Sequence, residues 1–301
     1  MRDAPGPSAC PQCGGETAHA FDVRDINRRT DATLFSYDRC AACGVIRLRN
    51  APGRMADYYP EDYYTIARSR EELAAWSRTE AYKLEIVSRF RGPGRLIEIG
   101  PASGAFAYLA KTDGYEVTAI EMDKRCCDYL ATEVGVRVIH SSDEAQALAS
   151  AQPADVIALW HVIEHLNDPW RMLEIAADKL RPGGILVLAT PNPDAWQFRL
   201  FGARWVHVDA PRHLWLIPAR VLAHRGEALG LRVLLQTTRD PGSLHWNRFG
   251  WEWSLANFFG ARPGRGLPAL AGRAASLLAS IAESREGQGC AYTMVLEKRA
   301  P

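Results

Sequence analysis

Four cysteines near the start of the 301-residue chain have the residue type and the spacing of a metal site. Cys10 and Cys13 form one C-x-x-C-G motif, and Cys40 and Cys43 form a second. Two cysteines on one tight turn can point both thiolates at the same ion, and two such pairs complete a closed tetrahedral zinc shell. We therefore predict a structural Zn²⁺ in a zinc-ribbon-like module over residues 1–53. The alternative is four unrelated thiols in a reducing compartment.

A second stretch with the residue types of a metal site reads HVIEHLNDP. His161, Glu164 and His165 form the H-x-x-E-H motif of inverted zinc hydrolases. Such a site needs one continuous helix, whereas Asp168 and Pro169 predict the N-cap and first position of a new helix. Because the strand-like run DVIALW precedes the motif, only a short turn remains. We therefore predict a strand-to-helix connection without metal, in which His161 meets a substrate.

A glycine-rich turn and two acidic residues have the types that bind a ribose-bearing ligand. In EIGPASG, Gly100 and Gly104 follow Glu98, and glycine lets the chain turn sharply and lets a ligand approach the backbone amides. Glu121 ends the next strand-like run, where a carboxylate can accept both hydroxyls of a ribose. The spacing differs from the dinucleotide fingerprint G-x-G-x-x-G, and the turn lacks a P-loop lysine.

The elements that must position these residues alternate in type. Strand-length apolar runs are separated by helical patterns from Gly94 onward, which predicts an α/β, Rossmann-like, doubly wound sheet of seven strands. The strand candidates are RLIEIG, YEVTAIEMD, VRVIHS, DVIALW, GILVLAT, LRVLLQT and AYTMVLEK. Residues 54–91 form a predicted helical connector in which four tyrosines lie within seven residues, and residues 241–289 form a predicted insertion that covers the substrate pocket.

Four ordered motifs carry a family resemblance: LIEIGPASG, AIEMD, ADVIALWHVIEHLNDP and KLRPGGILVLATPNP. With them the chain resembles the class I S-adenosylmethionine-dependent methyltransferases, in their small-molecule branch. The resemblance implies a methyltransferase domain over residues 92–301, with S-adenosyl-L-methionine as cofactor. It implies that the turn holds the methionine end, that Glu121 binds the ribose and that Met122 packs on the adenine. Pro101 has no amide to donate, so one backbone contact is expected to be missing. The cofactor-binding residues implied are Glu98, Gly100, Ala102, Ser103, Gly104, Glu121, Met122, Asp143 and Trp160.

The acceptor side is predicted from histidines and tryptophans in the second half of the chain. Methyl transfer requires alignment of donor and acceptor and, for a hydroxyl acceptor, removal of a proton, for which histidine is suited near neutral pH. The catalytic candidates are His161, His165, His213 and Asp209, the last of which would orient a histidine ring. The substrate-binding candidates are Tyr59, His207, Arg212, Trp246 and Trp251. Structural alternatives stay open: an internal hydrogen bond for His165, a polar loop with a salt bridge around Arg212, and tryptophans that anchor the insertion.

We therefore predict methyl transfer from S-adenosylmethionine to a small molecule, such as a natural product, a sugar or a phenolic compound. Oxygen is preferred over carbon or nitrogen as the acceptor atom. The alternative hypothesis is a non-catalytic methyltransferase-like platform whose zinc ribbon binds a protein or a nucleic acid. The altered turn around Pro101 is the feature that favours this alternative.

Composition and charge limit the partners. The net charge of +1 predicts that the chain does not bind nucleic acid through its overall charge. No apolar run reaches the roughly 20 residues of a transmembrane helix. The start of the chain has no apolar segment typical of a secretion signal, and seven cysteines, an odd number, suit a reducing compartment, so we predict a cytoplasmic protein without membrane insertion. An apolar helix from Leu267 to Ile281 predicts packing in the core or in a homodimer.

Overall fold

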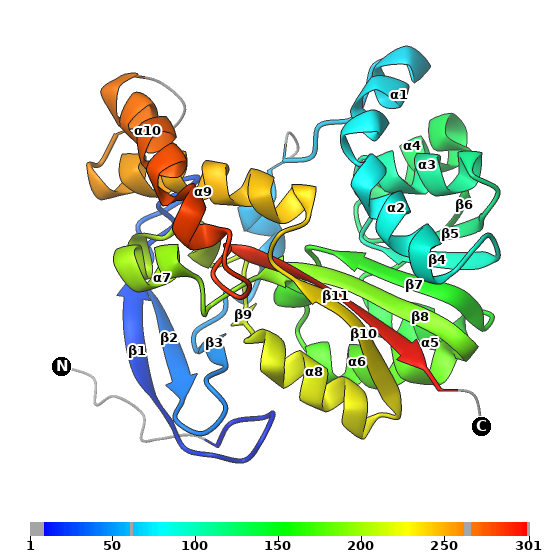
Figure 1. Cartoon of the computed structure of the whole chain (residues 1–301), viewed down its shortest axis with the longest axis horizontal. Coiled ribbons are helices and arrows are strands. Elements are labelled where there is room, and N and C mark those ends of the chain that lie inside the picture. Colours follow the sequence, from blue (N-terminus) through cyan, green and yellow to red (C-terminus); the bar gives the residue numbers. More distant parts are fainter. Residues whose placement is uncertain (1–8, 61–62, 262–265, 300–301) are drawn as a thin grey trace.

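The computed structural model describes residues 9–60, 63–261 and 266–299, and within them the chain forms two β-sheets with helices around them. Figure 1 shows the N-terminal strands of the smaller sheet, in blue, beside the larger sheet. The smaller sheet has the strand order β1-β2-β3-β9, and the larger sheet has the order β10-β11-β8-β7-β4-β5-β6. The larger sheet therefore belongs to the main domain alone, whereas the smaller sheet combines strands of the cysteine-rich module with one strand of the main domain.

The larger sheet contains the strands that the sequence predicts. In sheet order they are β10 (Leu231–Thr237), β11 (Ala291–Lys298), β8 (Leu180–Pro191), β7 (Ala154–Trp160), β4 (Arg95–Ile99), β5 (Glu116–Glu121) and β6 (Arg137–His140). Strands β4 to β8 run parallel, whereas β11 is antiparallel to both of its neighbours. Every residue of β7 is buried, as expected for a central parallel strand covered on both faces. The predicted seven-stranded, doubly wound α/β fold is confirmed for the described residues.

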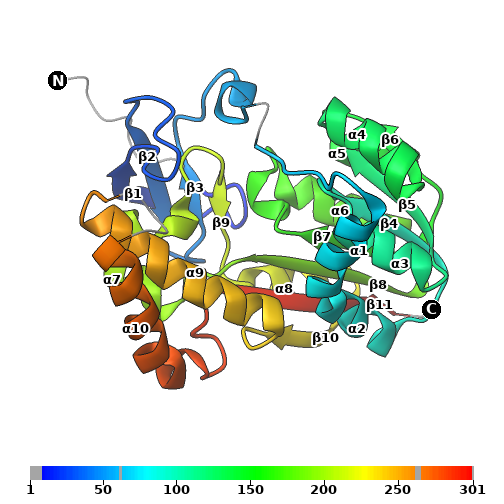
Figure 2. The same ribbon diagram turned by 90° about the horizontal axis from the view of Figure 1, so that it is seen from above.

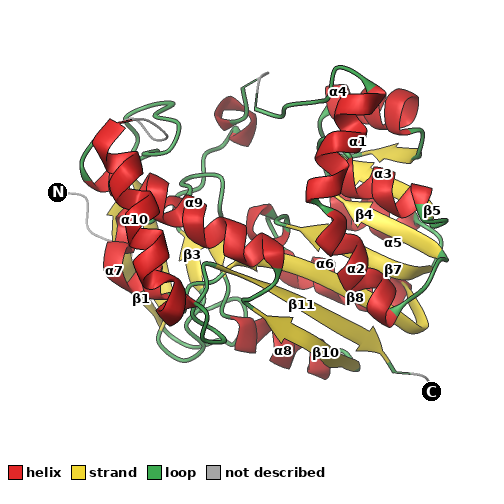
Figure 3. Ribbon diagram, turned by 45° about the horizontal axis from the view of Figure 1, so that its top comes forward, coloured by secondary structure: helices red, strands yellow, loops and turns green. Residues whose placement is uncertain are grey.

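Helices cover both faces of this sheet (Figures 1 and 3). The helices on one face are α1 (Arg70–Thr79), α2 (Ala81–Phe90), α3 (Ala105–Thr112) and α4 (Lys124–Tyr129). Those on the other face are α5 (Glu144–Ser150), α6 (Pro169–Lys179) and α8 (Ala219–Ala228). Short helical turns lie at Met55–Tyr58, Leu130–Val134, Ile163–His165, Gly202–Arg204 and Val206–Val208. The two faces hold separate apolar cores, so the sheet is buried between two helical layers.

The connection after β7 has the predicted form. The Asp168 carboxylate accepts hydrogen bonds from the amides of Trp170, at 3.1 Å, and Arg171, at 3.0 Å, so it caps the N-terminus of α6. Pro169 occupies the first turn of that helix. HVIEHL therefore forms a short turn and not the continuous helix that an inverted zinc-hydrolase site requires.

The segment between β10 and β11 forms α9 (Pro241–Phe258) and α10 (Gly266–Glu283), which pack against each other (Figure 2). The outer side of α10 exposes a row of large apolar side chains: Leu267, Leu270, Leu277, Leu278 and Ile281. Within the described residues, every helix falls short of the length and apolarity that a membrane crossing requires.

The smaller sheet takes one of its strands, β9, from the main domain. Its strands are β1 (Thr17–Val23), β2 (Phe35–Cys40), β3 (Ile46–Leu48) and β9 (Trp215–Leu216). The guanidinium of Arg47 on β3 lies 5.0 Å from the ring centroid of its pairing partner Trp215. The cysteine-rich module is therefore joined to the main domain by backbone hydrogen bonds as well as by side chains.

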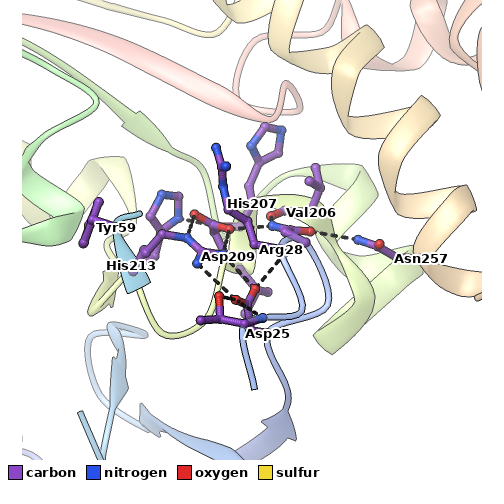
Figure 4. A network of polar contacts seen from close by, with 12 residues as sticks. Asp25, Arg28, Tyr59, Val206, His207, Asp209, His213 and Asn257 are labelled. Carbon is purple, nitrogen blue, oxygen red and sulfur yellow. Dashed lines mark hydrogen bonds and ion pairs between the residues drawn. The ribbon is translucent and has the colours of Figure 1, made fainter. Parts of the chain in front are cut away.

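A buried ionic network reinforces this junction (Figure 4). Arg212 is fully buried, and its guanidinium donates to both oxygens of Asp25, at 2.8 and 3.2 Å, and to both oxygens of Asp209, at 2.9 and 2.8 Å. Asn27 donates a further hydrogen bond to Asp209, at 2.6 Å. Burial alone would raise the pKa of Asp209, but the hydrogen bonds and charge of Arg212 hold it well below the usual range. The contribution of Asp209 to stability is therefore present above the unfolded-state pKa of about 3.9 and is lost as the pH falls below it.

Replacement of one buried carboxylate should strongly destabilise the chain. We expect Asp25→Ala to lower the free energy of unfolding by about 3–5 kcal/mol, because it leaves part of a buried guanidinium charge without its partner. Asp194→Ala, which breaks the exposed pair with Arg220, is the control and should cost about 1 kcal/mol or less. Chemical denaturation measures both variants, and equal losses would contradict the buried network as the main link between the modules.

Candidate active site

A cavity of about 1000 Å³ lies where the carboxyl ends of β4, β5 and β7 face the cysteine-rich module. This volume is at the upper limit of ordinary ligand pockets, roughly 300–1,000 Å³, and is large enough for a donor and an acceptor together. The carboxyl edge of a doubly wound sheet is where such folds bind ligands. The cavity has a cofactor side, on the turn after β4 and the end of β5, and an acceptor side, rich in histidines and aromatic rings.

The turn after β4 has the conformation that its glycines predict. Gly100 has φ 62° and Gly104 has φ 72°, both in the left-handed region. A Cβ on Gly100 would meet Val162 at 2.9 Å, and one on Gly104 would meet Leu130 at 2.6 Å. Gly104 therefore permits close packing against the helical turn at Leu130–Val134, whereas Gly100 and Ala102 line the cavity.

Backbone amides fix Glu121 at the end of β5. Its two carboxylate oxygens accept hydrogen bonds from the amides of Ala102, at 3.0 Å, Met122, at 2.8 Å, and Asp123, at 2.9 Å. Burial raises the pKa of this carboxyl group. Each oxygen of a carboxylate has about two acceptor sites, so Glu121 can hold its own turn and accept from a ribose hydroxyl as well.

Two buried polar atoms near this turn have no hydrogen-bond partner among the described residues: one oxygen of Glu98, Oε2, and the indole nitrogen of Trp160. Burial raises the pKa of Glu98 to about 8. A buried polar atom without a partner is costly, and a bound ligand is one way to satisfy it. A carboxylate oxygen suits the ammonium group of a methionine moiety. The residues present therefore fit S-adenosylmethionine: Glu98 and the turn would hold its methionine end, and Glu121 would hold its ribose.

The acceptor side is lined by histidines His161, His165, His207 and His213 and by aromatic residues Trp246, Phe249 and Trp253. His161 follows β7 with φ 57°, and its amide donates to the Ala189 carbonyl at 2.9 Å. The imidazole of His161 lies edge-on to Trp246, with ring centroids 5.0 Å apart. The left-handed backbone at His161 thus turns the chain away from the strand while the ring faces the cavity.

Three of these histidines are held by backbone carbonyls. The Nδ1 atoms of His165 and His213 lie 3.0 Å from the Arg212 carbonyl and 2.8 Å from the His207 carbonyl, respectively. Nε2 of His207 lies 3.4 Å from the Trp246 carbonyl. Burial lowers the pKa of His165 to about 4 and that of His207 to about 3, so both stay neutral at neutral pH. Burial alone would raise the pKa of Glu164, but contact with His161 and the neighbouring imidazoles lower it to about 2.

Some predicted site residues lie elsewhere. Arg212 is enclosed by two carboxylates and is not among the residues that line the cavity. Asp209 does line the cavity, but its carboxylate binds Arg212 and Asn27 rather than a histidine ring. Asp143 caps α5 through the Gln146 amide. The buried Trp251 donates to Glu283 at 3.0 Å, between α9 and α10. Glu98, Ser103 and Gly104 lie outside the residues that line the cavity.

Other cavity residues were not among the predicted sites: Asn27, Arg28, Thr30, Tyr63, Tyr64, Phe249 and Glu164. The first three belong to the cysteine-rich module, and no local sequence pattern indicates that this module reaches the cofactor domain. The tyrosines do have a signal, because they belong to a group of four tyrosines within seven residues of the connector, and one of that group, Tyr59, is a predicted substrate-binding residue. The Arg28 guanidinium lies 4.3 Å from the ring centroid of Tyr63.

The four cysteines of the N-terminal module lie together. One ligand atom from each of Cys10, Cys13, Cys40 and Cys43 lies within 4.8 Å of the others. The sulfurs of Cys10 and Cys43 are 3.7 Å apart, and those of Cys13 and Cys40 are 3.5 Å apart. Four sulfurs on a tetrahedral zinc ion, each about 2.3 Å from the metal, would be about 3.8 Å apart. The arrangement therefore fits a zinc ion.

Comparison with known proteins agrees with this geometry. A family described as "Methyltransferase domain" matches residues 62–236, which is more than half of the chain. The chain belongs to this family. This methyltransferase is 30% identical over 172 residues to the ubiquinone biosynthesis O-methyltransferase of Aeromonas salmonicida. The aligned region covers 54% of this chain and 70% of that protein. The ubiquinone biosynthesis O-methyltransferase of Parvibaculum lavamentivorans is 34% identical over 172 residues, or 54% of this chain and 66% of that protein.

Solved structures of methyltransferases are also similar to this chain. A SAM-dependent methyltransferase from Archaeoglobus fulgidus aligns with a TM-score of 0.48 at 18% identity, over 76% of this chain and 95% of that chain. The prediction of a class I S-adenosylmethionine-dependent methyltransferase is confirmed by the family match and the relatives, and S-adenosylmethionine is its methyl donor.

Loss of the Glu121 carboxylate should weaken cofactor binding. We expect Glu121→Ala to weaken binding of S-adenosylhomocysteine by about 10- to 100-fold, because a hydrogen bond to a charged group is worth about 1.5–3 kcal/mol. Isothermal titration of zinc-loaded protein measures the affinity. Glu116→Ala, at the exposed other end of β5, is the control and should bind like the wild type. Unchanged affinity in the Glu121 variant would contradict the ribose contact.

Proposed function

We propose that this methyltransferase transfers the methyl group of S-adenosylmethionine to an oxygen atom of a small molecule, such as a phenolic compound, a sugar or a natural product. The observation that carries the proposal is that histidines and aromatic rings share one cavity with Glu121 and the turn after β4. An acceptor there would stand opposite the methionine end of the cofactor, as in-line transfer requires. The two relatives are O-methyltransferases by name, which supports oxygen as the acceptor atom.

His161 is the proposed general base. Its side chain is 23% exposed and faces the cavity, and its Nδ1 lies 3.6 Å from Oε1 of the buried Glu164. The Glu164 carboxylate beside Nδ1 would orient the imidazole, so that its other nitrogen could take a proton from a hydroxyl acceptor. The depressed pKa values of His165 and His207 make these two less suited to the same task. The aromatic rings around Trp246 would position a planar acceptor.

Loss of the His161 imidazole should slow methyl transfer without loss of the cofactor. We expect His161→Ala to lower kcat by about 10²- to 10⁴-fold, the usual contribution of a general base, and to leave affinity for S-adenosylhomocysteine within a few-fold of the wild type. The measurement is formation of S-adenosylhomocysteine with a panel of phenols, sugars and amines. His224→Ala, exposed on α8, is the control.

The outcome of this panel also separates the two functional hypotheses. Turnover with amines alone would contradict oxygen as the acceptor atom. Absence of both turnover and S-adenosylhomocysteine binding would contradict an enzyme and favour the non-catalytic platform.

We also propose that Cys10, Cys13, Cys40 and Cys43 hold a structural Zn²⁺. The support is the cluster of their sulfurs and the closed tetrahedral shell that four thiolates give. The predicted cytoplasmic location would keep these thiols reduced. In this arrangement the zinc stabilises the turns from which β1, β2 and β3 extend, and through them the wall of the acceptor cavity.

Finally, we propose a homodimer formed through α10. Leu277, Leu278 and Ile281 are 77%, 83% and 78% exposed on one side of this helix, and exposed apolar patches of this kind mark interaction surfaces. We expect light scattering after gel filtration to give twice the chain mass for the wild type and the monomer mass for Leu278→Arg. Leu200 is 57% exposed on α7 (Trp196–Phe201), and Leu200→Arg should remain dimeric. A monomeric wild type at all concentrations would contradict this interface.

A further inference from the structure

A second group of potential metal ligands lies at the base of the acceptor side of the cavity. One ligand atom from each of Glu164, His165 and His213 lies within 4.8 Å of the other two. Glu164 and His165 belong to the short turn after β7, and His213 follows the Asp209–Arg212 loop. The imidazole centroids of the two histidines are 4.7 Å apart. We infer that these residues bind a divalent transition-metal ion that faces the acceptor.

The hydrogen bonds of the two histidines leave one nitrogen of each ring free for a metal. Nδ1 of His213 lies 2.8 Å from the His207 carbonyl, and Nδ1 of His165 lies 3.0 Å from the Arg212 carbonyl. Because a carbonyl oxygen only accepts, each Nδ1 carries the proton and each Nε2 keeps its lone pair. A backbone carbonyl that fixes the tautomer and the ring orientation is the usual outer partner of a metal-bound histidine.

Glu164 supplies the negative ligand. It is fully buried, and its Oε2 accepts a hydrogen bond from the Thr190 hydroxyl at 2.9 Å. Its Oε1 has no hydrogen-bond partner within the part of the chain that the structure describes, since Nδ1 of His161 is 3.6 Å away. A fully buried carboxylate oxygen without a donor is costly to keep. A cation between Oε1 and the two Nε2 atoms would remove this cost.

The donor set indicates the class of metal. Two imidazole nitrogens and one carboxylate oxygen suit Zn²⁺, Mn²⁺, Fe²⁺ or Co²⁺ better than Ca²⁺ or Mg²⁺, which prefer oxygen ligands alone. All three residues line the cavity. With three protein ligands the ion keeps an open position toward the cavity, in contrast to the closed cysteine site.

This arrangement differs from the inverted zinc-hydrolase site that the H-x-x-E-H motif suggested. That site would take both His161 and His165 from one helix, whereas here the third ligand comes from His213, in a distant segment of the chain. His161 remains free beside the ion. A role for the ion rests on the proposed function: it would hold and polarise the acceptor oxygen while His161 removes the proton. Metal binding itself does not depend on that function.

Metal content of the full-length protein tests the inference. We expect the wild type, loaded with excess Co²⁺ in place of its own metal and then dialysed free of unbound Co²⁺, to hold two equivalents. One equivalent should give the intense sulfur-to-cobalt absorption of a thiolate site and the other only the weak bands of nitrogen and oxygen ligands. Glu164→Gln and His213→Asn should each keep the thiolate absorption and lose the second equivalent. The affinity of each variant for the second Co²⁺ should fall by more than about 10- to 100-fold, which is the loss expected when only a hydrogen-bond partner of a metal ligand is removed.

Matched controls make this experiment decisive. Glu144→Gln replaces a carboxylate of the same cavity outside the cluster, and His224→Asn replaces an exposed histidine; both should keep two equivalents. A wild type with one equivalent, fully accounted for by thiolate absorption, would overturn the inference, and so would a second equivalent that persists in both Glu164→Gln and His213→Asn. Two equivalents in a protein that shows no methyl transfer would support the metal site and contradict only the proposed function.

Discussion

The buried guanidinium of Arg212 is the constraint on which the rest of the site depends. It lies between Asp25 of the cysteine-rich module and Asp209 of the main domain, with hydrogen bonds to both oxygens of each. A buried charge is tolerated only when its donors are this well paired, because desolvation of an ion costs several kcal/mol. The network therefore fixes the loop that carries His207 and His213 at one position relative to the module.

The cavity follows from that junction. The carboxyl edge of the larger sheet supplies the cofactor side through Gly100 and Glu121, and the loop fixed by Arg212 supplies part of the acceptor side. The cysteine-rich module closes the wall with Asn27 and Arg28. A structural zinc in that module would thus stabilise the acceptor side without contacting it. If the strands of the module unfolded, the wall of the cavity and the loop fixed by Arg212 would both lose their support. The module is part of the site and not an appendage beside it.

The sequence predicted those features whose causes are local. The strands of the larger sheet were predicted from apolar runs, and the start of α6 was predicted from Asp168 and Pro169, which act within one helical turn. The sequence could not predict β9, because two residues are too short to show a period, or the burial of Arg212, because its partner Asp25 is distant in the chain. A tryptophan supplies apolar contact area whether it binds a substrate or anchors the insertion, so the sequence leaves both roles open for Trp251. Only its neighbours in α9 and α10 decide between these two roles.

The sequence by itself determined the fold class, the cysteine pairs and the cofactor turn, since each rests on residues a few positions apart. Only the tertiary structure decided which polar groups meet. It placed His213 beside Glu164 and His165, and it enclosed Arg212 away from the cavity. The physical reason is that hydrogen bonds, ion pairs and metal ligands depend on distances of a few ångströms. For residues far apart in the chain those distances are set by packing and not by sequence spacing.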